Sequence, residues 1–299
     1  MTHIQSSTDP AQQVTPTQDT TMQAIIIVGY GAMAQAIAKG LNGIYPLEIC
    51  GRDSTKAEKF IAELGLVNAK AIPLESSSNN QVKCNRAKAS MECKASIVPA
   101  QDKIVLLCIK PYGLGSFSYL GKAKAVYSVL AGVSVATLQS HISAQAYIRL
   151  MPNIAALCGL SATTAFCLNA NRNQVKKICE SFGSVVFVED ERLIDASIAT
   201  SGSSPAFLAL IAQALVDSGV RAGLGRIDSL KLVKESFVGV GALLDRYTPQ
   251  ELIEQVTTPG GTTIEGLAAL ESSGVRGAIM RACQASVSKA IGAKTTQND

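Results

Sequence analysis

A short turn near the C-terminal end of the sequence carries residues suited to hold an anion. Residues 257–263 have the sequence TTPGGTT. The proline fixes one backbone angle, and the two glycines let the chain turn tightly and let a ligand approach the backbone amides. A helical pattern follows over residues 264–270, so the turn lies at a helix N-terminus, where free amides bind carboxylate or phosphate. A plain turn with a threonine cap is the alternative interpretation.

A second glycine-rich turn indicates a dinucleotide site. An isoleucine-rich run at residues 24–28, typical of a buried parallel strand, is followed by GYGAMA at residues 29–34 and then by a helical pattern. This is the G-x-G-x-x-A variant of the fingerprint that binds the cofactor pyrophosphate. In this motif Gly29 makes the turn, Gly31 admits the pyrophosphate, and Ala34 lets the helix pack closely on the strand.

The second predicted strand, residues 47–50, ends where dinucleotide-binding folds distinguish NADP from NAD. Arg52, Ser54 and Lys56 follow it, and a guanidinium with hydroxyls suits a 2′-phosphate. Asp53 points the other way, because a carboxylate here hydrogen-bonds the free ribose hydroxyl of NAD. A solvated helix start capped by Asp53 or Ser54 is the alternative without a ligand. The pattern predicts NADPH in preference to NADH.

The order of the predicted elements indicates an α/β Rossmann domain followed by an all-α domain. Further strands are predicted at residues 67–74, 103–109, 125–130, 146–150, 162–168 and 184–188. From residue 191 onwards every predicted element is a helix. The expected units are a disordered tail at residues 1–21, a Rossmann domain at 22–189 and a helical substrate and dimerisation domain at 190–299.

An irregular insertion is predicted at about residues 75–100, because SSSNN at its start has loop composition. Its basic residues either lie on an exposed loop or add to the positive field at the cofactor phosphates: Lys83, Arg86, Lys88 and Lys94. Its two cysteines lack the further ligands that a metal site needs.

A break between two helices is predicted at residues 201–205, where the sequence is SGSSP. The following segment, residues 206–220, is almost wholly apolar. It is short for a membrane span and contains Asp217, so a core or dimer-interface helix is favoured.

Composition narrows the function classes. The formal net charge of +4 is too small to indicate nucleic acid or an anionic membrane as partner. The two histidines, and eight cysteines without a C-x-x-C pair, predict no metal site. No signal-peptide pattern opens the sequence, so we expect reduced thiols and a cytoplasmic protein.

Five motifs, in order, resemble the pyrroline-5-carboxylate reductases, the last enzymes of proline biosynthesis. They are GYGAMA at 29–34, IKP at 109–111, MPN at 151–153, GSSPA at 202–206 and TPGGTT at 258–263. The resemblance covers about residues 22–294. It implies NAD(P)H-dependent reduction of the cyclic imine 1-pyrroline-5-carboxylate to L-proline, and an intertwined homodimer of a kind that often assembles further into decamers.

The resemblance also implies the site residues. Binding of the substrate carboxylate falls to Thr258, Gly261, Thr262 and Thr263, with the Thr263 hydroxyl near the imine nitrogen as the catalytic group. Cofactor contacts fall to Gly29, Tyr30, Gly31, Ala32, Met33, Ala34, Arg52, Ser54, Lys56, Cys108, Ile109, Lys110, Pro111 and Ala131.

Four departures from the family pattern leave alternatives open. Thr258 replaces a serine, Ser204 replaces a glycine, and Ile154 follows Asn153 where the family has Thr-Pro. The insertion at about residues 75–100 is longer than the family's short connection. The alternatives are a reductase of a related cyclic imino acid, or a non-catalytic NADP-binding regulatory homologue. Retention of both the nucleotide turn and the carboxylate turn favours catalysis.

Overall fold

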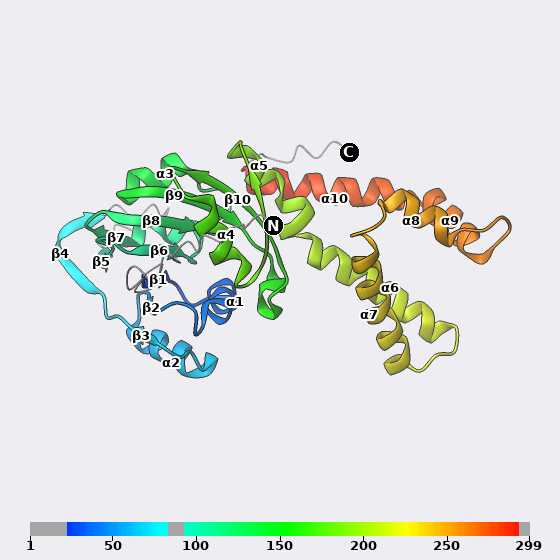
Figure 1. The fold of residues 1–299 in the computed structure, drawn as a ribbon, viewed down its shortest axis with the longest axis horizontal. Helices are drawn as coiled ribbons and strands as arrows, with labels where there is room; N and C mark the ends of the chain where they lie inside the picture. The colour runs from blue at the N-terminus through cyan, green and yellow to red at the C-terminus, as the bar shows by residue number, and fades with distance from the viewer. Residues whose placement is uncertain (1–22, 83–92, 293–299) are drawn as a thin grey trace, which may run out of the picture.

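A mixed eight-stranded sheet forms the centre of the N-terminal domain (Figure 1). The computed structural model describes residues 23–82 and 93–292, so the predicted tail at residues 1–21 lies outside the described residues. The strand order is β11-β10-β9-β8-β6-β1-β2-β3, and only β9 and β10 pair antiparallel. The strands are β1 Ile25–Val28, β2 Leu47–Cys50, β3 Ala69–Ala71, β6 Ile104–Leu107, β8 Ala123–Ser128, β9 Ala144–Met151, β10 Ser161–Leu168 and β11 Gly183–Val188.

The apolar run of β1 is explained by burial on both faces of the sheet. Ile25 and Ile27 belong to the core under α1, α2 and α4, whereas Ile26 and Val28 belong to the core that includes α3. All four side chains are at most 1% exposed, as expected for a parallel strand covered on both sides. The helices are α1 Ala32–Leu41, α2 Ser54–Leu64, α3 Val135–His141 and α4 Arg172–Glu180. The predicted α/β class of this domain is confirmed.

A small second sheet replaces the irregular insertion that the sequence predicts at residues 75–100. Its order is β4-β5-β7, with β4 Glu75–Val82, β5 Cys93–Pro99 and β7 Phe117–Leu120. The prediction is wrong there because strand pairing satisfies the backbone of a polar segment, whatever its side chains. Val98 is fully buried in the core below α3, which anchors β5. The predicted basic residues Lys83, Arg86 and Lys88 lie outside the described residues.

The predicted break between two helices is absorbed by a π-helical turn. The helix α5 Arg192–Ala196 continues through η3 Ile198–Gly202 into α6 Ser204–Arg221. The Ser203 amide donates to the Ile198 carbonyl at 2.7 Å, a step of five residues. Pro205 has no amide hydrogen for the Ser201 carbonyl, and the Ser204 hydroxyl donates to that carbonyl instead, at 3.3 Å. The helix therefore continues where composition predicted an interruption.

The helical domain extends from the sheet domain as an arm (Figure 1). Beyond α6 it contains α7 Arg226–Leu243, α8 Pro249–Val256, α9 Thr262–Ser272 and α10 Val275–Ala290. None of the residues of α8, α9 or α10 is buried. Large apolar side chains more than half exposed on the arm include Leu210, Ile227, Leu230, Val238 and Met280. Apolar surface exposed to this extent is typical of an interaction site.

The most apolar part of the arm passes a length and composition test for a membrane span. Residues Arg192–Arg221 form one continuous helix, and 11% of its most apolar 18-residue stretch is buried in the single chain. A helix that packs against a second chain has the same appearance when one chain is considered alone.

Candidate functional site

Gly29 makes a turn in which only glycine fits without strain. Its φ is +113°, and a Cβ there would lie 2.7 Å from the Cys108 carbonyl oxygen. Its amide donates to the Cys50 carbonyl at 2.8 Å. The turn is thereby fitted between the carboxyl ends of β2 and β6, which flank β1 in the sheet.

Gly31 differs from Gly29, because nothing in the described structure requires glycine there. It is the N-cap of α1 with φ −77°, and a Cβ would meet no heavy atom within 4 Å. No side chain caps α1 and its first turn has no acidic residue. Tyr30, Ala32 and Met33 are at least partly exposed, while Ala34 is fully buried against the sheet. Open amides beside an unfilled Cβ position fit a diphosphate.

Tyr30 connects the nucleotide turn to the start of α2. Its ring lies against Gly51, where any Cβ would collide with it, and its hydroxyl accepts the Asp53 amide hydrogen at 3.2 Å. Burial raises the pKa of Tyr30, so the hydroxyl stays protonated and free to donate. The position beside the end of β2 is where the adenine ribose lies in this fold class.

The Asp53 carboxylate is used as a helix cap. It accepts the Lys56 amide hydrogen at 3.3 Å and lies 3.8 Å from the Lys56 ammonium. Arg52 and Ser54 are exposed beside it. The feature that counted against NADP in the sequence therefore has a structural role in α2, and Lys56 is partly engaged by the same carboxylate.

The predicted contacts that follow β6 and β8 meet at the same edge of the sheet as Gly31. Cys108 is buried, and burial raises its thiol pKa to about 12, so this thiol packs rather than reacts. Lys110, Pro111 and Ala131 are exposed. Because β8, β6, β1 and β2 are adjacent and parallel, the structure brings all of the predicted cofactor residues to one edge of the sheet. We call this edge, at the carboxyl ends of these four strands, the cofactor edge.

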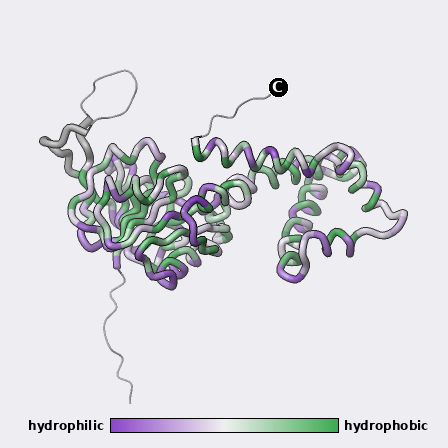
Figure 2. Tube along the Cα trace, turned by 90° about the horizontal axis from the view of Figure 1, so that it is seen from above, coloured by the Kyte–Doolittle hydropathy of each residue, from purple (hydrophilic) through white to green (hydrophobic). Residues whose placement is uncertain are grey.

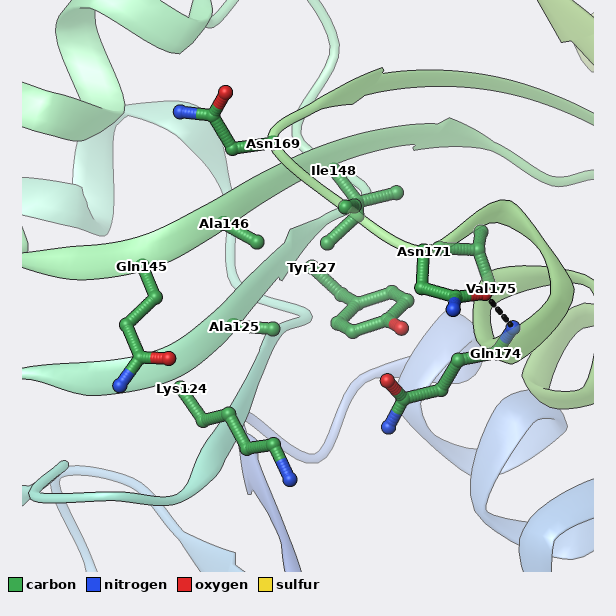
Figure 3. Close-up of a pocket in the computed structure, with 11 residues that line it drawn as sticks. Lys124, Ala125, Tyr127, Gln145, Ala146, Ile148, Asn169, Asn171, Gln174 and Val175 are labelled. Carbon is green, nitrogen blue, oxygen red and sulfur yellow. Dashed lines mark hydrogen bonds between the residues drawn. The ribbon is translucent and has the colours of Figure 1, made fainter.

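Two cavities of the sheet domain lie elsewhere. The pocket in Figure 3, of about 190 Å³, is lined by residues of β8 and β9, by the turn before α4 and by the start of α4, with Lys124, Tyr127 and Gln174 around it. A second pocket, of about 290 Å³, lies at the beginnings of β2 and β3. Neither includes a predicted site residue, because both are near the amino ends of strands whose carboxyl ends form the cofactor edge.

The TTPGGTT turn joins α8 to α9 and leaves the N-terminus of α9 open. Gly260 has φ +68°, and Gly261 is an N-cap without a side-chain hydrogen bond. The Gly261 amide donates to the Thr258 carbonyl at 3.0 Å, and a Cβ on Gly261 would collide with the Thr258 hydroxyl. Thr258, Thr262 and Thr263 are exposed. Amides and hydroxyls at an uncapped helix start can bind a small carboxylate.

One chain does not bring this turn to the cofactor edge. Figure 1 shows α8 and α9 at the end of the arm remote from β1 and α1, and the view from above in Figure 2 also separates the arm from the sheet domain. The family resemblance assigns both motifs to one site, whereas in a single folded chain the two motifs lie at opposite ends of the molecule.

Asn153, in the MPN motif, holds the π-helical turn. It is 7% exposed, its side-chain amide donates to the Ser201 carbonyl at 3.1 Å, and its Oδ1 accepts the Ala155 amide hydrogen at 3.1 Å. The Ser201 carbonyl is the one that also accepts from Ser204. The serine that departs from the family pattern thus adds a hydrogen bond within the helix.

The comparisons with known proteins agree with this architecture. A model described as pyrroline-5-carboxylate reductase dimerisation matches residues 191–292. The chain is 41% identical to the pyrroline-5-carboxylate reductase of Helicobacter pylori strain J99 over 276 residues. This aligned region covers 90% of this chain and 99% of that relative.

Two solved structures extend the comparison. The 1-pyrroline-5-carboxylate reductase of Streptococcus pyogenes superimposes with a TM-score of 0.72 at 25% identity, over 91% of this chain and 100% of that one. The pyrroline carboxylate reductase of Plasmodium falciparum with NADP bound shares the fold, with a TM-score of 0.67 at 21% identity over 92% and 99% of the two chains. On the strength of the sequence identity and its coverage, the chain belongs to the pyrroline-5-carboxylate reductase family.

Proposed function

We propose that this chain is a pyrroline-5-carboxylate reductase whose active site is shared between two chains. The family assigns the reaction, which is hydride transfer from NAD(P)H to the cyclic imine 1-pyrroline-5-carboxylate, giving L-proline. The observation that carries the shared site is the separation of two uncapped helix starts, α1 at the cofactor edge and α9 on the dimerising arm. A second chain that packs on the exposed apolar arm delivers its α9 to the cofactor edge of the first.

The cofactor half of the site consists of the amides that begin α1 and the exposed groups around them. Gly31 leaves the space that a pyrophosphate needs, and the α1 dipole favours its charge. When bound, the nicotinamide cofactor supplies the hydride, and the protein positions it. Lys110, Pro111 and Ala131 are proposed to line the same edge. Arg52 and Ser54 are proposed to bind the 2′-phosphate of NADPH.

The substrate half consists of the N-terminus of α9. The Thr262 and Thr263 amides are proposed to bind the substrate carboxylate, with the Thr258 hydroxyl at the same opening. The Thr263 hydroxyl is proposed to hydrogen-bond at the imine nitrogen, where the product carries a proton. Holding the carboxylate and the nitrogen at two points orients the imine carbon toward the hydride.

Replacing Thr263 by alanine tests the substrate half. We expect kcat/KM for the imine to fall about ten- to hundredfold through loss of one positioned hydrogen bond, while NADPH affinity, measured by fluorescence titration, stays unchanged. Thr257→Ala is the matched control, because the Thr257 hydroxyl already donates to the Ile253 carbonyl at 2.9 Å within α8. Equal losses of imine reduction and NADPH affinity in Thr263→Ala would make the turn structural.

Replacing Arg52 by alanine tests the preference for NADPH. A charge-assisted hydrogen bond contributes about 1.5–3 kcal/mol, so NADPH affinity is expected to fall about ten- to hundredfold with little change for NADH. Lys59→Ala removes a cation from α2, the helix that follows Arg52, where it pairs with Glu63 at 3.6 Å, and is expected to leave both affinities unchanged. An equal loss of NADPH and NADH affinity in Arg52→Ala would contradict 2′-phosphate binding by Arg52.

The proposed function is tested by following NADPH oxidation by purified protein with 1-pyrroline-5-carboxylate, with NADH in parallel. Saturable turnover that favours NADPH supports the reaction and the phosphate site. Faster turnover of a six-membered cyclic imino acid would instead identify a related reductase. Protein that binds NADPH but oxidises it with neither imine would be a regulatory homologue.

The proposed assembly is a homodimer of intertwined arms in the cytoplasm, with decamers as the larger form. The exposed apolar surface of α6–α10 supports burial against a second copy. Light scattering on the purified protein distinguishes dimer from decamer. Monomers in solution would contradict the shared site.

A further inference from the structure

A cluster of three charged residues, a buried arginine and two partly buried carboxylates, joins the base of the arm to the sheet. Arg149 lies in β9, between β8 and β10, and its side chain is 3% exposed. Its guanidinium donates to Asp195 at 2.8 Å and to Glu191 at 3.0 Å. The two carboxylates are on successive turns at the start of α5, so the planar guanidinium holds both at once.

The same carboxylates bind the turn that follows β8 at the cofactor edge. Glu191 accepts the Val135 amide hydrogen at 2.7 Å, and Asp195 accepts the Gly132 amide hydrogen at 3.4 Å. Gly132, with φ +70°, also touches the last turn of α10, because a Cβ there would lie 2.8 Å from the Ala290 carbonyl oxygen. The first and last helices of the arm therefore meet at the turn that carries the proposed cofactor contact Ala131.

We propose that Arg149 is a positioning residue that sets the direction of the arm relative to the cofactor edge. This inference rests on the proposed function, in which the far end of the arm delivers the α9 turn to the partner's site. The cluster lies at the base of the arm, so a small rotation of α5 moves the α9 turn, at the far end of the arm, through a much larger distance. Removal of the guanidinium leaves two partly buried carboxylates without their cation, and their repulsion displaces α5 from β9.

One feature of the sequence points to the role of Arg149. Arg149 is a lone cation in an otherwise apolar strand, YIRLM. A charge in such a strand requires buried partners, and Glu191 and Asp195 lie over forty residues later in the chain. The pairing becomes visible only in the folded structure.

Arg149→Lys and Asp195→Asn test the proposal in the full-length enzyme. Lysine keeps the charge but cannot hold both carboxylates in one plane, and asparagine keeps the shape of Asp195. For both variants we expect kcat to fall and KM for the imine to rise, so that kcat/KM falls at least about tenfold from misplacement of the α9 turn. NADPH affinity is expected to change less than about threefold, because the α1 contacts remain in place.

Glu48→Gln is the matched control. Glu48 is a buried carboxylate that likewise pairs with cations, with Lys103 at 2.6 Å and Lys70 at 3.1 Å. Burial opposes its ionisation, but the hydrogen bonds from the two lysines hold its pKa below the usual value. It lies away from the arm, so Glu48→Gln is expected to lower the melting temperature without lowering kcat.

Hydrogen exchange provides a readout independent of turnover. The amides of Gly132 and Val135 are expected to exchange faster in Arg149→Lys and Asp195→Asn than in the wild type. In Glu48→Gln their exchange rates are expected to be unchanged. Unchanged kcat/KM and unchanged exchange in both cluster variants overturn the proposal, as does a loss of NADPH affinity equal to the loss of kcat/KM. A wild-type protein without imine reduction contradicts the proposed function instead, and the exchange experiment then still tests the cluster.

Discussion

Replacing Gly31 by valine is expected to abolish cofactor binding while the fold survives. A Cβ at this position meets no protein atom within 4 Å, and φ is −77°, which any residue adopts. The branched side chain would instead occupy the space proposed for the cofactor pyrophosphate. We expect NADPH affinity to fall at least about a hundredfold, or ~2.7 kcal/mol. Fluorescence titration measures the affinity, and circular dichroism measures the melting temperature, which is expected to stay within a few degrees.

Gly29→Ala is the informative contrast to Gly31→Val. Its methyl group would lie 2.7 Å from the Cys108 carbonyl oxygen at a φ of +113°, so the backbone must shift, at a cost of about 1–3 kcal/mol. This variant is expected to lose stability and cofactor binding together. If Gly31→Val retains NADPH affinity, the open start of α1 is not the pyrophosphate site.

Two inactive variants are expected to restore activity when they are combined in one dimer. Gly31→Val destroys the cofactor half of a site, and Gly261→Val destroys the substrate half, because its side chain would collide with the Thr258 hydroxyl. If each site takes its halves from different chains, a mixed dimer contains one intact site and one doubly damaged site. Equal co-expression makes half of the dimers mixed, so activity is expected to return to about a quarter of the wild-type value.

The controls for this complementation are the two variants expressed separately, each of which is expected to be almost inactive. A mixture that stays as inactive as its components, although differently tagged chains co-purify, would contradict the shared site. It would show that each chain folds its own α9 turn onto its own cofactor edge. Recovery without co-purification of the two chains would indicate residual activity in one variant.

Much of the proposed nucleotide half of the site follows from the sequence because its determinants are local. The run Ile25–Val28 is apolar at every position because both faces of β1 are covered, and GYGAMA follows it at once. The TTPGGTT turn is equally local, since two glycines and a following helical pattern are enough to indicate an open helix start. Neighbouring residues determine each of these features through backbone geometry, so a single stretch of sequence specifies them.

Other features depended on partners distant in the chain. The polar segment at 75–82 forms β4 because β5 supplies its hydrogen bonds, and the helix continues past Pro205 because Ser204 and Asn153 satisfy the Ser201 carbonyl. Neither the pairing of β4 nor the continuous helix can be deduced from the composition of the segment.

The sequence alone determined the family motifs, the α/β order and the residues that we propose for the two half-sites. Only the tertiary structure showed that one chain keeps those halves apart, and that Arg149 joins the arm to the cofactor edge through Glu191 and Asp195. The physical reason is the range of the interactions. Turns and strands follow from neighbouring residues, whereas the direction of an arm and the pairing of buried charges follow from packing between segments far apart in the chain.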